Sequence, residues 1–178
     1  MMVCSPSDPS EVKEILHITS SNSSPSYMRL NRSGEEYIKF IDDFELGNLH
    51  LAYQGSPKST KKAFISNGAI CNEVYKDLIK AASLSDLYSL PIIKPLLVDK
   101  IIEKLIMYEE IIIVEEHQLI GGLGATIQEI LYDSYSSSDI SSLPKIFRIG
   151  IEDTFQSVAG TQDFLRERAG LFNYRKYL

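Results

Sequence analysis

The run Ile111-Ile112-Ile113-Val114 restricts the fold of this chain more than any other segment. Four β-branched residues in succession favour a β-strand. A strand that is apolar on both faces is typical of the centre of a parallel sheet, which helices cover on each side. Segments with strand and helix patterns alternate around this run at short spacing, as they do in βαβ units. The sequence therefore predicts the α/β class: a three-layer α/β/α domain with a mostly parallel sheet.

Two kinds of apolar spacing mark the other elements of this domain. Apolar residues recur every three or four positions, as on one face of a helix, over residues 69–82, 98–108, 121–132 and 161–168. Short apolar runs between turn residues predict strands at residues 49–53, 63–65, 87–90 and 145–151.

A helix and a short strand are predicted upstream of this domain. The segment Asp8-Pro9-Ser10-Glu11 is typical of a helix start, because aspartate can cap a helix and proline suits the first helical position. The helix is expected to end in the serine-rich segment 20–25, and a strand at 26–30 comes next. The acidic stretch 33–47 is either a linker between two units or a solvated loop within one domain.

Charge and composition exclude several classes of protein. The net charge of −6 argues against a nucleic-acid partner. No apolar run approaches the roughly 20 residues that span a bilayer, and the N-terminal segment lacks the pattern of a signal peptide. Two cysteines, Cys4 and Cys71, provide neither a disulfide framework nor a metal cluster. We expect a cytoplasmic protein without a membrane or nucleic-acid partner and without a metal site of its own.

The segment Glu115-Glu116-His117 follows the most apolar strand, and ligands gather at the carboxyl ends of parallel strands. His117 could serve as an acid–base group that the carboxylates tune. Alternatively, these polar residues only leave the core and cap the next element. Because a histidine without a nucleophile is weak evidence for chemistry, His117 and Glu116 are predicted to lie near a site, and no residue is assigned a catalytic role.

The segment Gly121-Gly122-Leu123-Gly124 opens the helix after this strand. Glycines in such a place can expose backbone N–H groups to a phosphate. The dinucleotide fingerprint fails, however, because Ile127 stands where its last glycine is needed, and the Gly-Lys-Ser/Thr sequence of a P-loop is absent. The alternative, which we favour, is that the glycines let the helix pack closely against the sheet or a partner subunit.

Arg29 and Arg32 flank the end of the predicted strand at 26–30. A planar guanidinium suits a phosphate or a carboxylate. The alternative is that both are surface arginines without a ligand.

Taken in order, these segments resemble the transketolase family. The strand with its acidic pair and the Gly-Gly-x-Gly helix start resemble the C-terminal domain of transketolase and its relatives. His117 after the two glutamates favours transketolase over deoxyxylulose-phosphate synthase and the β subunits of 2-oxoacid dehydrogenases, which share the architecture. One position departs from the family pattern, since Asn67 stands before the glycine of the first strand. The other matching segments are 63–68, 90–96, 148–155 and 160–171, and at the front 3–11 and 25–32.

The resemblance implies two parts. Residues 1–45 would be the C-terminal fragment of a pyrimidine-binding domain with a linker, and residues 46–178 a transketolase C-terminal-like domain. Arg32 matches an arginine that contacts the substrate phosphate in transketolase-like enzymes, and Arg29 is a second candidate. For Gly121, Gly122 and Gly124 the family implies structural or subunit-contact roles.

The resemblance also implies an incomplete catalytic centre. Family members bind thiamine diphosphate and Mg²⁺ through a Gly-Asp-Gly motif and activate the cofactor with a glutamate, and the sequence carries neither part. We therefore expect the C-terminal component of an enzyme that transfers two-carbon ketol units between sugar phosphates. Thiamine diphosphate and Mg²⁺ would bind only in the complete assembly, a homodimer or a heteromer with a cofactor-binding subunit. The alternative is a non-catalytic dimerisation or partner-binding domain left after loss of the catalytic halves.

Overall fold

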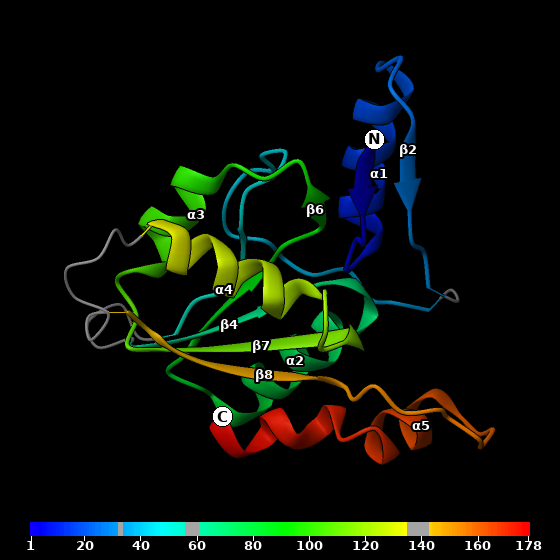
Figure 1. The fold of residues 1–178 in the computed structure, drawn as a ribbon, viewed down its shortest axis with the longest axis vertical. Coiled ribbons are helices and arrows are strands. Elements are labelled where there is room, and N and C mark those ends of the chain that lie inside the picture. Colours follow the sequence, from blue (N-terminus) through cyan, green and yellow to red (C-terminus); the bar gives the residue numbers. More distant parts are fainter. Residues whose placement is uncertain (32–33, 56–60, 135–142) are drawn as a thin grey trace.

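The structure is a computed structural model that describes residues 1–31, 34–55, 61–134 and 143–178. Within these residues, the larger sheet has five strands in the order β3-β5-β4-β7-β8. Figure 1 labels β4, β7 and β8 of this sheet. The bounds of the strands are β3 His50–Tyr53, β4 Lys62–Ser66, β5 Asp86–Ser89, β7 Glu110–Gln118 and β8 Lys145–Ile151. Strands β5, β4, β7 and β8 run parallel, and β3 runs antiparallel to β5. The α/β class and the mostly parallel sheet are confirmed.

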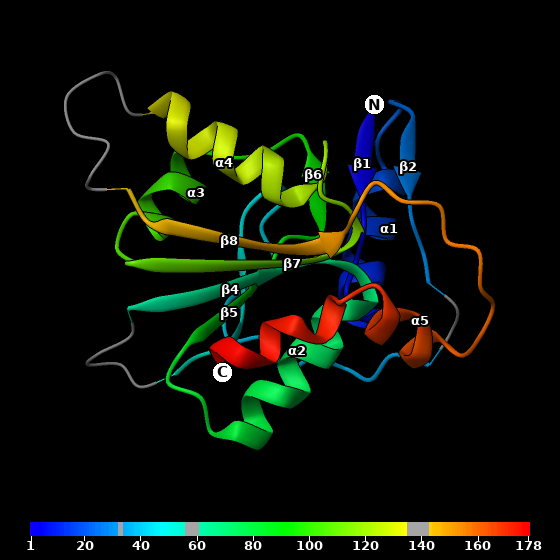
Figure 2. The same ribbon diagram turned by 60° about the horizontal axis from the view of Figure 1, so that its bottom comes forward.

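Helices cover both faces of this sheet, as Figure 2 shows. Their bounds are α2 Gly68–Ala81, α3 Val98–Leu105, α4 Leu123–Ser134, α5 Gln162–Arg168 and the 3-10 helix η2 Leu171–Tyr177. On one face, α3 and α4 share a buried cluster with Ile111 and Ile113. On the other face, α2 and η2 share a second cluster with Ile112 and Val114. Alternate residues of β7 therefore enter opposite cores, which explains why this run is apolar throughout.

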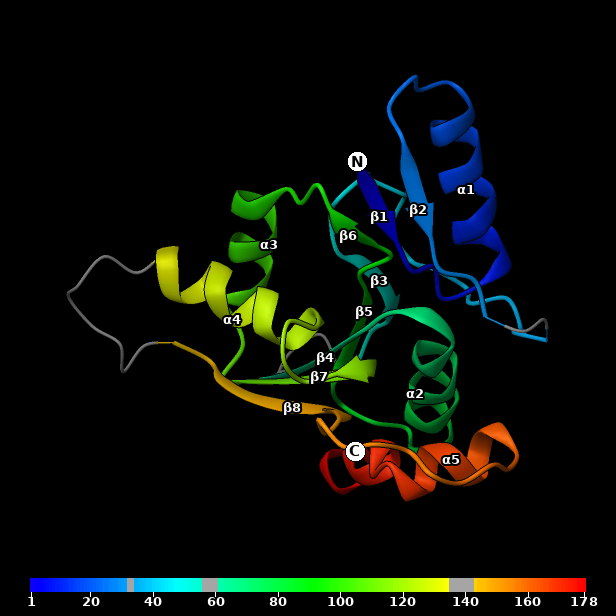
Figure 3. The ribbon, with the colours of Figure 1, turned by 45° about the vertical axis from the view of Figure 1, so that its right-hand side comes forward.

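A second, smaller sheet joins the N-terminal segment to the larger domain (Figure 3). Its strands are β1 Met2–Cys4, β2 Ser26–Met28 and β6 Ile92–Lys94, in the order β2-β1-β6. Strand β1 is parallel to β2 and antiparallel to β6. Helix α1, Pro9–Ser20, covers this sheet with Ile15, which packs with Ile92 of β6. The N-terminal unit is thus completed by a strand that comes from the middle of the chain.

The structure differs from the sequence prediction mainly in β7 and β6. Strand β7 continues to Gln118 instead of ending at Val114, because its extension pairs with β8 as far as Ile151. His117 therefore lies on the strand and not after it. Strand β6 and helix η2 were not predicted. No helix in the described ranges is both long enough and apolar enough to cross a membrane.

Candidate functional site

A cavity of about 260 Å³ lies where strands β1, β4 and β7 end, between the N-terminal unit and the larger domain. Arg29 borders it from the N-terminal unit, and His117, Gly121 and Gly122 border it from the larger domain. The structure thus brings together four residues from three segments that the sequence singled out separately. A larger hollow of about 500 Å³ lies between α4 and the start of β8, but none of these four residues lines it.

The carboxylate of Glu115 occupies the N-terminus of α4. Its Oε2 accepts a hydrogen bond of 2.6 Å from the backbone N–H of Leu123, and its Oε1 accepts one of 3.0 Å from Gly124. A negative charge is favourable there because unpaired N–H groups and the helix dipole point toward it. Burial raises the pKa of Glu115, and these two backbone hydrogen bonds counteract part of that rise. The helix start is therefore occupied by the chain's own carboxylate.

The glycines of this turn make room for that carboxylate. A Cβ atom on Gly122 would lie 2.0 Å from Glu115 Oε2 and 2.5 Å from the carbonyl oxygen of Gln118. On Gly124 it would lie 2.8 Å from Nε of Arg148. Gly121 has a φ of +71°, a backbone conformation that favours glycine. The geometry thus gives Gly122 and Gly124 a packing role within the chain, and their role in subunit contact stays a prediction.

Glu116 connects three segments of the chain. Its carboxylate pairs with Arg166 of α5 at 2.9 Å and 3.3 Å, and its carbonyl oxygen accepts a hydrogen bond of 2.9 Å from Nη1 of Arg29. The Arg166 side chain is 4% exposed. His117, the next residue, is exposed, and its Nδ1 lies 3.0 Å from the carbonyl oxygen of Gln118. Glu116 thus connects Arg29 and helix α5 to strand β7 beside the cavity. The imidazole of His117 borders the cavity itself.

Arg32 lies outside the residues that the structure describes. Arg29 is described, and its guanidinium reaches the end of β7 across the junction of the two units. The segment that leads toward Arg32 is thereby fixed to the larger domain at one defined point.

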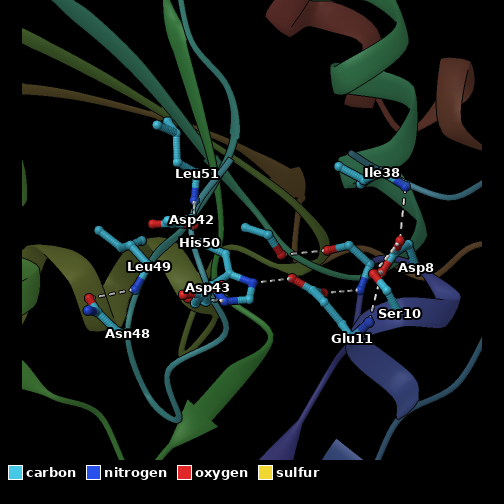
Figure 4. A network of polar contacts seen from close by, with 12 residues as sticks. Asp8, Ser10, Glu11, Ile38, Asp42, Asp43, Asn48, Leu49, His50 and Leu51 are labelled. Carbon is cyan, nitrogen blue, oxygen red and sulfur yellow. Dashed lines mark hydrogen bonds and ion pairs between the residues drawn. The ribbon is translucent and has the colours of Figure 1, made fainter. Parts of the chain in front are cut away.

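A buried polar network that sequence reasoning missed lies at the same junction (Figure 4). Asp8 caps α1 by accepting the N–H of Glu11 at 2.9 Å, and it also accepts the N–H of Ile38 at 2.9 Å. Oε1 of Glu11 lies 3.6 Å from Nδ1 of the buried His50, whose Nε2 lies 3.1 Å from the carbonyl oxygen of Asp43. The predicted helix start was the signal for Asp8 and Glu11, but nothing in the sequence around His50 indicates its burial.

The described residues offer no side-chain cluster for the Mg²⁺ that accompanies the cofactor implied by the resemblance. Among residues 1–31, 34–55, 61–134 and 143–178, no group of three or more histidine, cysteine, aspartate or glutamate side chains could hold a metal ion. The buried Glu115 already uses both oxygens within the chain. The arrangement can orient segments and can present a guanidinium and an imidazole to a small molecule.

Comparisons with known proteins identify what this architecture resembles. No family model matches the chain. A putative transketolase C-terminal section from Methanocaldococcus jannaschii is 27% identical over an alignment of 177 positions, which covers 96% of this chain and 52% of that protein. The resemblance to the C-terminal section of transketolases is confirmed. A subunit of an apulose-4-phosphate transketolase from Actinobacillus succinogenes is 24% identical, over 96% of this chain and 53% of that protein.

The fold is shared with a solved transketolase structure. A protein described as a split gene transketolase in an inactive β4 tetramer superposes with a TM-score of 0.72 at 23% identity, over 96% of this chain and 52% of that one. The transketolase-like chain spans about half the length of the curated relatives it matches.

Proposed function

We propose that this chain is the C-terminal component of a transketolase-type enzyme that transfers two-carbon ketol units between sugar phosphates. The observation that carries the proposal is the likeness of 96% of the chain to a transketolase C-terminal section and to a transketolase subunit. In this proposal residues 1–45 complete a pyrimidine-binding domain and residues 46–178 form the C-terminal domain. The strand order β2-β1-β6 supports an intimate junction between the two parts.

Thiamine diphosphate with Mg²⁺ would supply the electron sink for ketol transfer in the complete assembly. Because the described residues include no cluster that could hold Mg²⁺, the proposed contribution of the chain is to bind and orient the substrate. Arg32 would hold the phosphate of the sugar, because a guanidinium binds phosphate through two parallel hydrogen bonds. Arg29 is the weaker, second candidate for this role, because the resemblance matches Arg32 to the arginine that contacts the phosphate.

The chain would act with a partner, either a second copy or a cofactor-binding subunit. One relative is named as a transketolase subunit, and the structural neighbour is described as a β4 tetramer. That neighbour is also described as inactive, which favours a second candidate function: self-association or partner binding without catalysis.

A reconstitution experiment separates the two candidate functions. The purified chain would be mixed with a cofactor-binding transketolase subunit, thiamine diphosphate and Mg²⁺, and ketol transfer from a ketose phosphate to an aldose phosphate would be followed. The proposed function requires activity in the mixture that neither chain shows alone. A stable complex without transfer would support the non-catalytic function and contradict the catalytic one.

A further inference from the structure

The cavity between the two units contains polar side chains from three separate segments. Arg29 follows β2, Asn67 stands between β4 and α2, and His117 lies near the end of β7. Tyr27 and Ile93 of the small sheet also line it and provide apolar surface. Such a combination of apolar surface and a few convergent polar groups is typical of a site for a small molecule.

Each of the three polar side chains has capacity left for a ligand. Arg29 uses Nη1 for the carbonyl of Glu116, which leaves other N–H groups of its guanidinium available. Asn67 occupies the N-cap position of α2, yet its side chain makes no capping hydrogen bond within the described part of the chain. His117 has Nδ1 beside the carbonyl of Gln118, so Nε2 is the nitrogen that can face a ligand.

The charges at the cavity favour a ligand with one negative group. Arg29 provides a permanent positive charge in the lining. The carboxylate of Glu115 is also in the wall, but both of its oxygens accept backbone N–H groups of α4, whose dipole offsets the negative charge. A cavity of about 260 Å³ is slightly smaller than the ~300–1,000 Å³ typical of ligand pockets, which suits a small metabolite.

We propose that this cavity binds a small metabolite through one anionic group, a phosphate or a carboxylate, which Arg29, Asn67 and His117 hold together. The site lies within this chain, and an anion can occupy it without the partner subunit or the cofactor. The proposal therefore does not depend on the role of Arg32 in ketol transfer. Its position between β1, β4 and β7 means that an occupant would contact both units at once.

The test is a titration of the isolated chain with inorganic phosphate and, separately, with acetate, each against sodium chloride at the same ionic strength. The chain has three histidines, so the imidazole signals can be resolved by NMR. We expect a saturable shift of the His117 signals, with those of His17 on the exposed face of α1 unchanged. The anion that binds more tightly, phosphate or acetate, would identify the anionic group of the natural ligand as a phosphate or a carboxylate.

Two variants and one control make the test specific. Removing a charge-assisted bond weakens binding by about 10- to 150-fold, so Arg29→Gln should weaken phosphate or acetate binding by that factor. Asn67→Ala should weaken the binding of phosphate or acetate less, because the hydrogen bond that it removes comes from an uncharged amide. Arg168→Gln, which removes a charge from the exposed face of α5, should leave binding unchanged. Absence of a saturable His117 shift, or an equal loss in Arg168→Gln, would overturn the proposal and leave the reconstitution experiment unaffected.

Discussion

The carboxylate of Glu115 on β7 accepts a hydrogen bond of 2.6 Å from the backbone N–H of Leu123, the first residue of α4. This contact links the central strand directly to the start of the next helix. It also explains the glycine at position 122, because a Cβ there would lie 2.0 Å from the same carboxylate oxygen. The turn between β7 and α4 is thus shaped around one buried acid.

The first prediction concerns this turn. Gly122→Val should lower the free energy of unfolding by at least ~1–3 kcal/mol, the usual cost of overpacking, since Glu115 must move away from α4. The matched control is Gly121→Ala, where the φ of +71° is unfavourable but a Cβ meets no described atom within 4 Å. Its cost should be about 1 kcal/mol. Urea unfolding measures the free energy of unfolding of both variants. Equal losses of stability in the two variants would contradict the close packing at Gly122.

The second prediction is a pH dependence. Because burial raises the pKa of Glu115 in the folded state, the folded chain takes up a proton more readily than the unfolded chain at this position. The contribution of Glu115 to the free energy of unfolding therefore increases as the pH falls from its raised pKa in the folded chain toward its pKa in the unfolded chain, near ~4.3. Urea unfolding of the native chain and of Glu115→Gln between pH 7 and 5 measures the effect. The native chain should gain stability relative to the variant as the pH falls, and a constant difference would contradict the prediction.

Much of the fold could be predicted because its signals are local. The burial of Ile111 and Ile113 in one core and Ile112 in the other follows from the strand period and the apolar run. The bounds Lys145–Ile151 of β8 coincide with the predicted strand. Strand β6 could not be predicted, because its three residues become a strand only by pairing with β1, about ninety positions earlier in the chain.

The candidate site was predicted in pieces and not as an assembly. The sequence singled out Arg29, Glu116 and His117 separately, but only the tertiary structure shows that Arg29 contacts the carbonyl of Glu116. Arg166 was missed as the partner of Glu116, because an arginine on an amphipathic helix is usually a solvated one. His50 was missed for a similar reason, since its surroundings include Glu11 and Asp43, which lie at other positions in the chain.

The third prediction tests the pair of Glu116 and Arg166. A double-mutant cycle with Glu116→Gln and Arg166→Met should give a coupling energy of about 1–3 kcal/mol, because the arginine is 4% and the glutamate 21% exposed. The matched control is the pair of Lys76 and Glu36, which are 41% and 74% exposed. Its coupling should stay below about 1 kcal/mol. Similar coupling in both pairs would show that burial does not strengthen the pair at Glu116.

The fourth prediction concerns the two thiols. Burial raises the pKa of the Cys71 thiol to about 12 and also raises that of Cys4. Since the thiolate is the reactive form, neither cysteine should react with a disulfide reagent such as Ellman's reagent at pH 8 while the chain is folded. When urea has unfolded the chain, both thiols should react rapidly. Rapid reaction of one thiol in the folded chain would contradict the burial of that cysteine.

The last prediction concerns Arg32 and rests on the proposed ketol transfer. A charge-assisted bond to phosphate is worth roughly 1.5–3 kcal/mol, or about 10- to 150-fold in affinity. In the reconstituted enzyme, Arg32→Ala should therefore raise the KM for phosphorylated sugars by about that factor, as steady-state kinetics would measure. Unphosphorylated acceptors such as glycolaldehyde should be little affected, because they lack the group that the arginine holds.

Two comparisons decide whether Arg32 acts on the phosphate or on the fold. Arg32→Lys should recover only part of the lost affinity, since an ammonium keeps the charge but cannot form two parallel hydrogen bonds. Arg29→Ala is the matched arginine variant, and it should change the KM less, because the phosphate contact is assigned to Arg32. Equal losses for Arg32→Ala on phosphorylated and unphosphorylated acceptors would refute the phosphate contact. Such a result would instead indicate a structural arginine at the junction of the two units, whose loss disturbs every substrate alike.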